Sequence, residues 1–302
     1  MIDFDAYLIV DWSANGKPKT GKDSIWYCML LRDGDHLCEV GLENPATRQE
    51  AFERVASLLV ENVKRHLVTL VGFDFPYGYP SGFAAALGIK DKERPAWEQV
   101  WNFLSGKIQD KENNSNNRFR VAAALNNTIS SANYPFWGCP RNMTCPTLSP
   151  TKPRGQFNCL LADKRITERR INAAKSAWQL FYKGAVGSQA LLGIPYVARL
   201  RNHPRLAEFS QVWPFETGMR KLPERKQQSW LVLHAEIFPA IINVTPTQHE
   251  IKDAAQVLSL AKHFAKLDEE GELAAFFDGP DDLSDKERSL VCSEEGWILG
   301  VK

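Results

Sequence analysis

The sequence predicts an α/β fold in which helices flank a mixed sheet. The first observation is a succession of three short apolar runs, at Ala6–Asp11, 24–31 and 36–40. Strand-like runs joined by short turns predict a three-stranded antiparallel meander. The second observation is that residues 47–64 repeat apolar positions at helical spacing before another apolar run at 67–73. Because a strand that follows a helix can return parallel to the first strand by a right-handed crossover, we expect parallel strands beside the meander.

A third observation predicts a large, mostly helical insertion after this first unit. The pattern is mainly helical over residues 81–205, and strand character resumes at 209–215 and 230–238, followed by a helix at 250–267. We therefore expect residues 1–80 and 206–302 to form one discontinuous core. The helices expected within the insertion span residues 95–104, 118–131, 165–183 and 189–201.

Composition sets broad limits on function. The 302 residues are 44% hydrophobic and 24% charged, with a formal net charge of +1, which is ordinary for a soluble globular protein and indicates no particular partner. No apolar run approaches the roughly 20 residues that a membrane-spanning helix needs, so we expect a cytoplasmic protein that does not enter a membrane. The six cysteines form no CxxC pair, which favours free thiols.

Acidic residues end two of the predicted parallel strands. Asp11 closes the first strand, and Asp74 follows the apolar start of VGFDFPYGYP, residues 71–80. Open α/β sheets bind their ligands at the carboxyl ends of parallel strands, so we expect the two carboxylates to lie close together at that edge. An alternative for Asp74 is that it accepts hydrogen bonds from amides of the proline-containing turn after it.

Three further acids occur late in the chain. Glu236 lies within an apolar strand, where an unpaired charge needs a metal, a cation or a raised pKa. Asp253 begins the last long helix, where it could equally stabilise the helix dipole. Glu216 follows the strand-like run FSQVWPF and competes with Glu236 for the same role.

Several segments resemble one family. They are YLIVDWSA (7–14) with GKDSIW (21–26), VGFDFPYGYP (71–80), NRFRVAAALN (117–126), PFWGCP (135–140), GAVGSQALLGIP (184–195), VWPFETG (212–218), AEIFPA (235–240) and KDAAQVLSLA (252–261). In this order they resemble a family of predicted ribonuclease H-like nucleases within the ribonuclease H-like superfamily. The resemblance covers most of the chain and implies a ribonuclease H-like sheet.

The resemblance also implies a set of metal ligands. It assigns catalytic and metal-binding roles to Asp11, Asp74, Glu236 and Asp253, and it implies two Mg²⁺ or Mn²⁺ ions. The family match favours Glu236 over Glu216, which we keep as an alternate metal ligand or a residue that supports the ligands. The chemistry agrees, because these hard cations prefer carboxylate oxygens and a pair of them needs several such ligands.

Candidate substrate contacts surround the first acid. The turn after Asp11 is polar and could meet a phosphate backbone, although a solvated turn is an equal alternative. Aromatic residues after Asp74 could stack on bases or simply pack within the insertion. The glycine-containing loop at 184–188 opens a helix and could bind an anion at its N-terminus. The residues expected to contact substrate are Ser13, Lys17, Lys19, Lys22 and Tyr77.

These features together predict a metal-dependent phosphodiester hydrolase, a nuclease that acts on DNA or RNA as its substrate and partner. One alternative is an ATP-binding protein of the actin-like type, which has a related sheet but usually carries a duplicated domain. Another is a non-catalytic binding module with the same fold. The sequence makes no prediction about oligomeric state.

Overall fold

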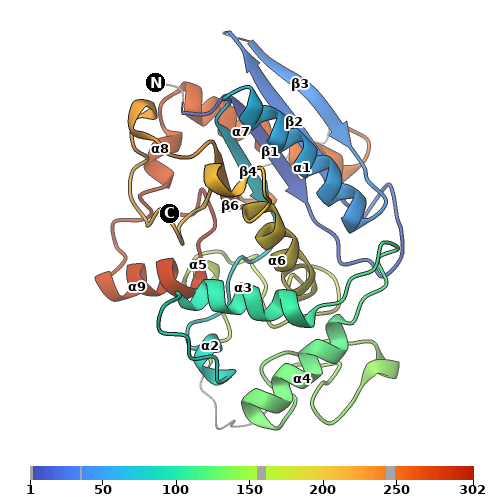
Figure 1. The fold of residues 1–302 in the computed structure, drawn as a ribbon. Coiled ribbons are helices and arrows are strands. Elements are labelled where there is room, and N and C mark those ends of the chain that lie inside the picture. The colour runs from blue at the N-terminus through green and yellow to red at the C-terminus, as the bar shows by residue number, and fades with distance from the viewer. Residues whose placement is uncertain (1–2, 35, 155–160, 243–248) are drawn as a thin grey trace.

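The computed structural model describes residues 3–34, 36–154, 161–242 and 249–302. Its centre is a six-stranded sheet in the order β3-β2-β1-β4-β6-β5, and helices cover both faces (Figure 1). Strands β1, β2 and β3 form an antiparallel meander, and β4, β6 and β5 continue the sheet in parallel with β1. The mixed α/β class predicted from the sequence is confirmed. The strands are β1 Ala6–Asp11, β2 Trp26–Asp33, β3 His36–Glu43, β4 Thr69–Phe73, β5 Ser210–Val212 and β6 Val232–Glu236.

The helices form two layers around this sheet. In Figure 1, α1 lies over one face and α7 over the other, while α2, α3 and α4 extend below the sheet. Helix α1 begins after Thr47, whose hydroxyl accepts a hydrogen bond from the backbone N–H of Glu50. The helices are α1 Arg48–Lys64, α2 Phe83–Ala86, α3 Ala96–Lys107, α4 Arg118–Ser130, α5 Ile166–Arg169, α6 Gly187–Arg201, α7 Lys252–Glu269, α8 Leu273–Phe276 and α9 Asp285–Leu290, and a π-helical turn follows at Val291–Glu295.

Alternation along each central strand creates two hydrophobic cores. On β1, Leu8 and Val10 pack with residues of α1, α3 and α6, whereas Tyr7 and Ile9 pack with residues of α7. We call these the insertion-side core and the α7-side core. The insertion helices α3 and α6 therefore share one core with α1 and the sheet.

The helix predicted over residues 165–183 is wrong. Only α5 is helical there, and turns follow it to residue 186. Arg165 and Trp178 are both fully buried, at 0% and 1% exposure. On one continuous helix they would point roughly 140° apart, so a single helix on the surface could not bury both. Tertiary burial of these two side chains therefore overrides the local helical pattern.

The segment after β4 packs tightly on the π-helical turn near the C-terminus. A Cβ atom at Gly78 would lie 2.6 Å from the carbonyl oxygen of Glu295 and still closer to that of Glu294.

We therefore expect Gly78→Ala to lower the free energy of unfolding by about 1–3 kcal/mol through overpacking, as measured by urea denaturation. The control is Gly106→Ala on α3, where the space around a new Cβ is open. That helix substitution is expected to raise stability by up to about 1 kcal/mol, and similar effects of the two changes would contradict the packing argument.

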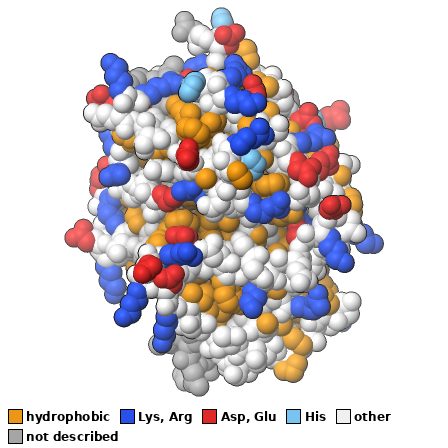
Figure 2. Space-filling view, viewed as in Figure 1, with side chains coloured by type: hydrophobic (Ala, Val, Ile, Leu, Met, Phe, Trp, Pro, Cys, Tyr) orange, Lys and Arg blue, Asp and Glu red, His pale blue; other side chains and the backbone are white. Residues whose placement is uncertain are grey.

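Other features concern the surface and the thiols. Lysine and arginine side chains alternate with acidic ones over the face in Figure 2. Within the described ranges, no helix has both the length and the apolar character needed to cross a bilayer. The described cysteines, Cys28, Cys38, Cys139, Cys145 and Cys292, are free thiols as expected, and Cys159 lies outside the described residues.

Candidate metal centre and binding cleft

Asp11 and Asp74 form a carboxyl pair at the ends of neighbouring parallel strands. The register aligns Val10 with Phe73, so the two aspartates occupy the next step of each chain. The backbone N–H of Trp12 donates to Asp74 Oδ1 at 2.7 Å, and the two carboxyl groups are close enough for each to shift the pKa of the other. The parallel pairing predicted from the sequence thus brings the acids together.

The electrostatics of this pair are unfavourable for two negative charges. Burial and the neighbouring charges of Asp74 and Asp253 raise the pKa of Asp11 well above its usual range. Burial raises the pKa of Asp74 to about 7, against the lowering effect of the N–H group of Trp12 and of the bond to Asp11. Among the described residues, neither carboxylate has a lysine or arginine in an ion pair. A cation bound here would offset this repulsion.

Asp253 approaches the pair from α7. It lies in the first turn of that helix, and its Oδ2 accepts a hydrogen bond from the backbone N–H of Asp23 at 2.6 Å. It is close enough to raise the pKa values of both strand-end acids. Side chains alternate between the two faces of a strand, so Asp11 lies on the same face of β1 as Ile9, which packs against α7. This explains why Asp253 of α7 lies near Asp11.

The loop after β1 is fixed by a buried arginine. The guanidinium of Arg48 on α1 donates to the carbonyl oxygens of Ser13 and Asn15 at 2.9 and 2.8 Å. The same group forms a two-point ion pair with Asp110 at 2.5 and 2.7 Å. A planar guanidinium held at both ends is a rigid anchor, so the loop next to Asp11 has a defined position.

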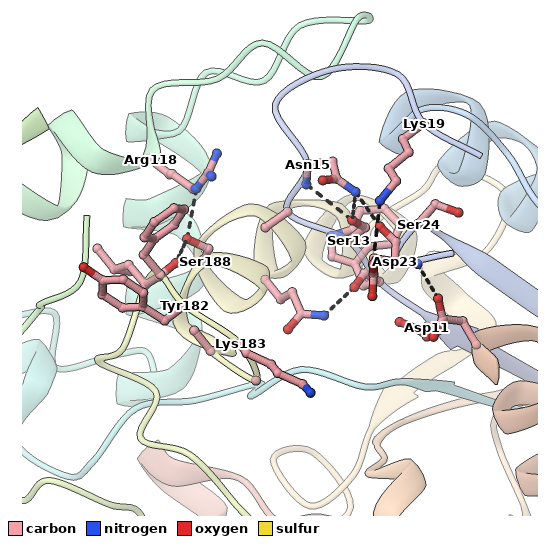
Figure 3. A pocket seen from close by; sticks show the side chains of 18 residues that line it. Asp11, Ser13, Asn15, Lys19, Asp23, Ser24, Arg118, Tyr182, Lys183 and Ser188 are labelled. Atoms are coloured by element: carbon pink, nitrogen blue, oxygen red, sulfur yellow. Dashed lines mark hydrogen bonds and ion pairs between the residues drawn. The ribbon is translucent and has the colours of Figure 1, made fainter. Parts of the chain in front are cut away.

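A cleft of about 720 Å³ opens in front of Asp11. One wall comes from the loop after β1 and includes Ser13 and Lys19; Asp253 also lines the cleft. The opposite wall comes from the insertion, and Figure 3 shows Arg118, Ser188, Tyr182 and Lys183 on that side, across from Ser13, Asn15 and Lys19. Asp74 does not line the cleft. The cleft therefore combines an acidic floor with cations on both walls.

The predicted substrate contacts divide into two groups. Ser13 and Lys19 line the cleft, and the Oγ of Ser13 accepts a hydrogen bond from the side-chain amide of Asn15 at 2.7 Å. Lys17 and Lys22 are exposed on the same loop but do not line the cleft.

Tyr77 is not a surface residue. Its side chain is 1% exposed and packs against Phe75 and Trp101, and the indole N–H of Trp101 donates to the carbonyl oxygen of Tyr77. Burial beneath the insertion therefore keeps this ring from stacking on a ligand, contrary to the substrate role predicted for it. The alternative that it packs within the insertion agrees with its position.

The carboxylate of Glu236 forms an ion pair with an arginine. Arg165 donates to both of its carboxylate oxygens, at 2.5 and 2.7 Å, and the backbone N–H of Tyr77 donates to one of them at 2.9 Å. On β6, Val232 belongs to the insertion-side core and Ala235 to the α7-side core, so Glu236 takes the insertion side. Glu236 and Asp74 share only a small cavity of about 20 Å³. The structure thus places Glu236 on the opposite face from Asp11 and Asp253.

Glu216 is also separated from the aspartates. Its carboxylate pairs with the guanidinium of Arg201 at 2.7 and 2.8 Å, and one oxygen also accepts the backbone N–H of Val212. With its oxygens engaged at the end of α6, Glu216 supports the local fold.

The residues present fit a weakly preformed magnesium site. In the part of the chain that the structure describes, no three His, Cys, Asp or Glu side chains form a ready metal cage. Mg²⁺, however, usually keeps several water ligands and binds through one or two carboxylates. The Asp11–Asp74 pair supplies such oxygen ligands without an ion-paired lysine or arginine among the described residues, and Asp253 adds negative charge nearby.

The insertion contributes cleft residues that the sequence prediction missed. Arg118, Phe181, Tyr182 and Lys183 all line the cleft, although α4 and the 181–183 segment are far apart in sequence. Two signals were available. Arg118 lies within the family-like segment NRFRVAAALN, and the 181–183 triplet directly precedes the glycine-containing loop at 184–188.

Comparisons with protein-family models, curated proteins and solved structures find no match to this chain.

Proposed function

We propose that this protein is a metal-dependent phosphodiester hydrolase that acts on nucleic acid. The observation that carries the proposal is the Asp11–Asp74 carboxyl pair, which lacks a cationic partner among the described residues and of which Asp11 lines the acidic floor of the cleft. A strand order with an antiparallel meander followed by parallel strands supports a ribonuclease H-like sheet. The end of β1 is also where the family resemblance expects the first metal ligand.

The chain's own residues supply binding and orientation. Asp11 and Asp74 would hold a Mg²⁺ or Mn²⁺ ion, and the N–H group of Trp12 fixes the orientation of the Asp74 carboxylate. When bound, such an ion supplies Lewis acidity, polarising a phosphoryl oxygen and lowering the pKa of water. Lys19 on the cleft wall is placed to attract the phosphate backbone towards the acids.

Cation binding and strand cleavage test the proposal together. Calorimetry with Mn²⁺ and with Mg²⁺ is expected to show binding to the wild type and at least a 10-fold weaker affinity for Asp11→Asn. Fluorescently labelled DNA and RNA are expected to be cleaved by the wild type with Mn²⁺ and to stay intact with a chelator. Asp33→Asn, an exposed change at the distant β2–β3 turn, serves as the control. Equal cleavage by the wild type and Asp11→Asn would refute the assignment.

The ATP-binding alternative has less support. It predicts a duplicated domain, whereas the described residues form a single six-stranded sheet. We therefore propose only the hydrolysis of phosphodiester bonds in nucleic acid.

A further inference from the structure

The insertion wall of the cleft presents two exposed aromatic rings. Phe181 is 37% exposed and Tyr182 is 52% exposed, and both line the cleft. The other large hydrophobic side chains exposed in the described ranges, Val40 and Met143, lie outside it. The ring centroids of Phe181 and Tyr182 are 5.0 Å apart and the ring planes are tilted by 59°, so a flat group that stacks on one ring meets the other at an angle.

The backbone holds these rings in an unusual conformation. Tyr182 has a φ of 78°, which is sterically unfavourable for a bulky side chain. The turn is nevertheless fixed, because the N–H of Ala185 donates to the carbonyl of Tyr182 at 3.0 Å and the hydroxyl of Ser188 donates to that of Leu180 at 2.6 Å. Strain that the surrounding structure maintains beside a cleft is typical of functional sites.

A cation without a carboxylate partner lies on the same wall. Arg118 donates from Nε to the Ser188 hydroxyl at 2.9 Å and from Nη1 to the side chain of Asn116 at 2.9 Å. No ion pair of Arg118 occurs among the residues that the structure describes. Burial, with the nearby charge of Arg48, lowers its pKa to about 10, against the opposing effect of Asp110, which is itself paired with Arg48. An anion from a ligand would supply the missing charge.

We propose that this wall binds an unpaired nucleotide of single-stranded nucleic acid, with the base stacked on Phe181 and Tyr182 and a neighbouring phosphate on Arg118 and Lys183. The inference rests on the proposed function, because it orients the same strand towards Asp11. It selects a single strand because stacking on protein rings needs a free base face, which a duplex covers with neighbouring base pairs. The arrangement is sequence-tolerant, since every base has such a face.

Fluorescence anisotropy in EDTA tests this inference without hydrolysis. The probes are labelled ten-nucleotide oligo(dT) and oligo(U), which distinguish DNA from RNA, and a ten-base-pair duplex. The wild type is expected to bind at least one single strand about 10-fold more tightly than the duplex. Tyr182→Gly removes the ring and suits the positive φ, and it is expected to raise the Kd for the single strand about 10-fold. Lys183→Gln, at an exposed position, is expected to reduce the salt dependence of binding.

Met143→Ala, an exposed apolar change outside the cleft, is the matched control and is expected to bind like the wild type. Equal binding of duplex and single strand, or unchanged binding by Tyr182→Gly and Lys183→Gln, overturns the inference even where metal-dependent cleavage is observed. Tyr182-dependent binding of a single strand by a protein that shows no Mn²⁺ binding upholds the inference while the proposed function fails.

Discussion

Replacing Arg165 with alanine is expected to lower the free energy of unfolding by about 3–5 kcal/mol, because it leaves buried carboxylates without their cation. Arg165 is 0% exposed and bonds Glu168 and Glu236, which are each 2% exposed. Its Nη1 also donates to the carbonyl oxygen of Glu295 at 2.8 Å. Urea denaturation at pH 7 measures the loss.

Two further variants define the origin of this effect. Arg169→Ala removes an exposed guanidinium one turn further along the same short helix and is expected to change stability by less than about 0.5 kcal/mol. Adding Glu236→Gln and Glu168→Gln to Arg165→Ala removes the uncompensated charges, so it is expected to restore part of the loss. If the triple variant were no more stable than Arg165→Ala, buried charge would not be the cause.

Asp74→Asn is expected to stabilise the metal-free protein while reducing hydrolysis roughly 100-fold or more. The asparagine can still accept the Trp12 N–H and donate to Asp11, so the local geometry is kept. It removes one of two mutually repelling acids, which is expected to add about 1–3 kcal/mol at pH 8. It also removes a metal ligand, so Mn²⁺ is expected to stabilise the wild type and have little effect on the variant.

The stabilisation has a defined pH dependence. The pKa of Asp74 is 3.8 in a model peptide and is raised to about 7 in the fold. The folded protein therefore binds the Asp74 proton more tightly than the unfolded chain does. The stability that this proton contributes is complete below about pH 4 and is lost as the pH rises through about 7. The advantage of Asp74→Asn is thus expected to be small near pH 4 and largest above pH 7. Chemical denaturation in EDTA at several pH values measures it, and an advantage that grew towards low pH would contradict the assigned shift.

The pairing of the strand-end acids follows from features visible in the sequence. The apolar runs of β1 and β4 have ordinary strand lengths, and the helix between them requires a crossover. Parallel register then places Asp11 beside Asp74. Asp253 follows because α7 has a broad apolar face that must cover the sheet, which brings its first turn to the same edge.

The face of the sheet on which Glu236 lies could not be predicted from the sequence. Its strand is buried on both faces, so the pattern shows that Glu236 shares a face with Val232 and His234 but not on which side of the sheet that face lies. A shift of one residue in the β4–β6 register would reverse the assignment. Its partner Arg165 is 71 residues away, in a segment whose local pattern predicts a longer helix than the fold contains.

The cleft-lining residues of the insertion were not predicted from the sequence for a different reason. Arg118 and the 180–185 turn are both hydrogen-bonded to Ser188 of α6, which brings them to the same cleft wall, and no short-range pattern encodes that arrangement. Likewise, the burial of Tyr77 depends on α3, which supplies Trp101. Long-range packing thus determines which aromatic residues of the insertion remain available to a ligand.

The ion cluster around Arg165 also determines when the chain can finish folding. The carboxylate of Glu295 accepts the backbone N–H groups of Ser81 and Ile166, and the N–H of Leu299 donates to the carbonyl of Glu236. During synthesis from the N-terminus, the insertion and β6 emerge from the ribosome well before these partners. The backbone N–H groups of Ser81 and Ile166 therefore gain these partners only once residues 295–299 have been made, and the same late segment ties the insertion to the sheet.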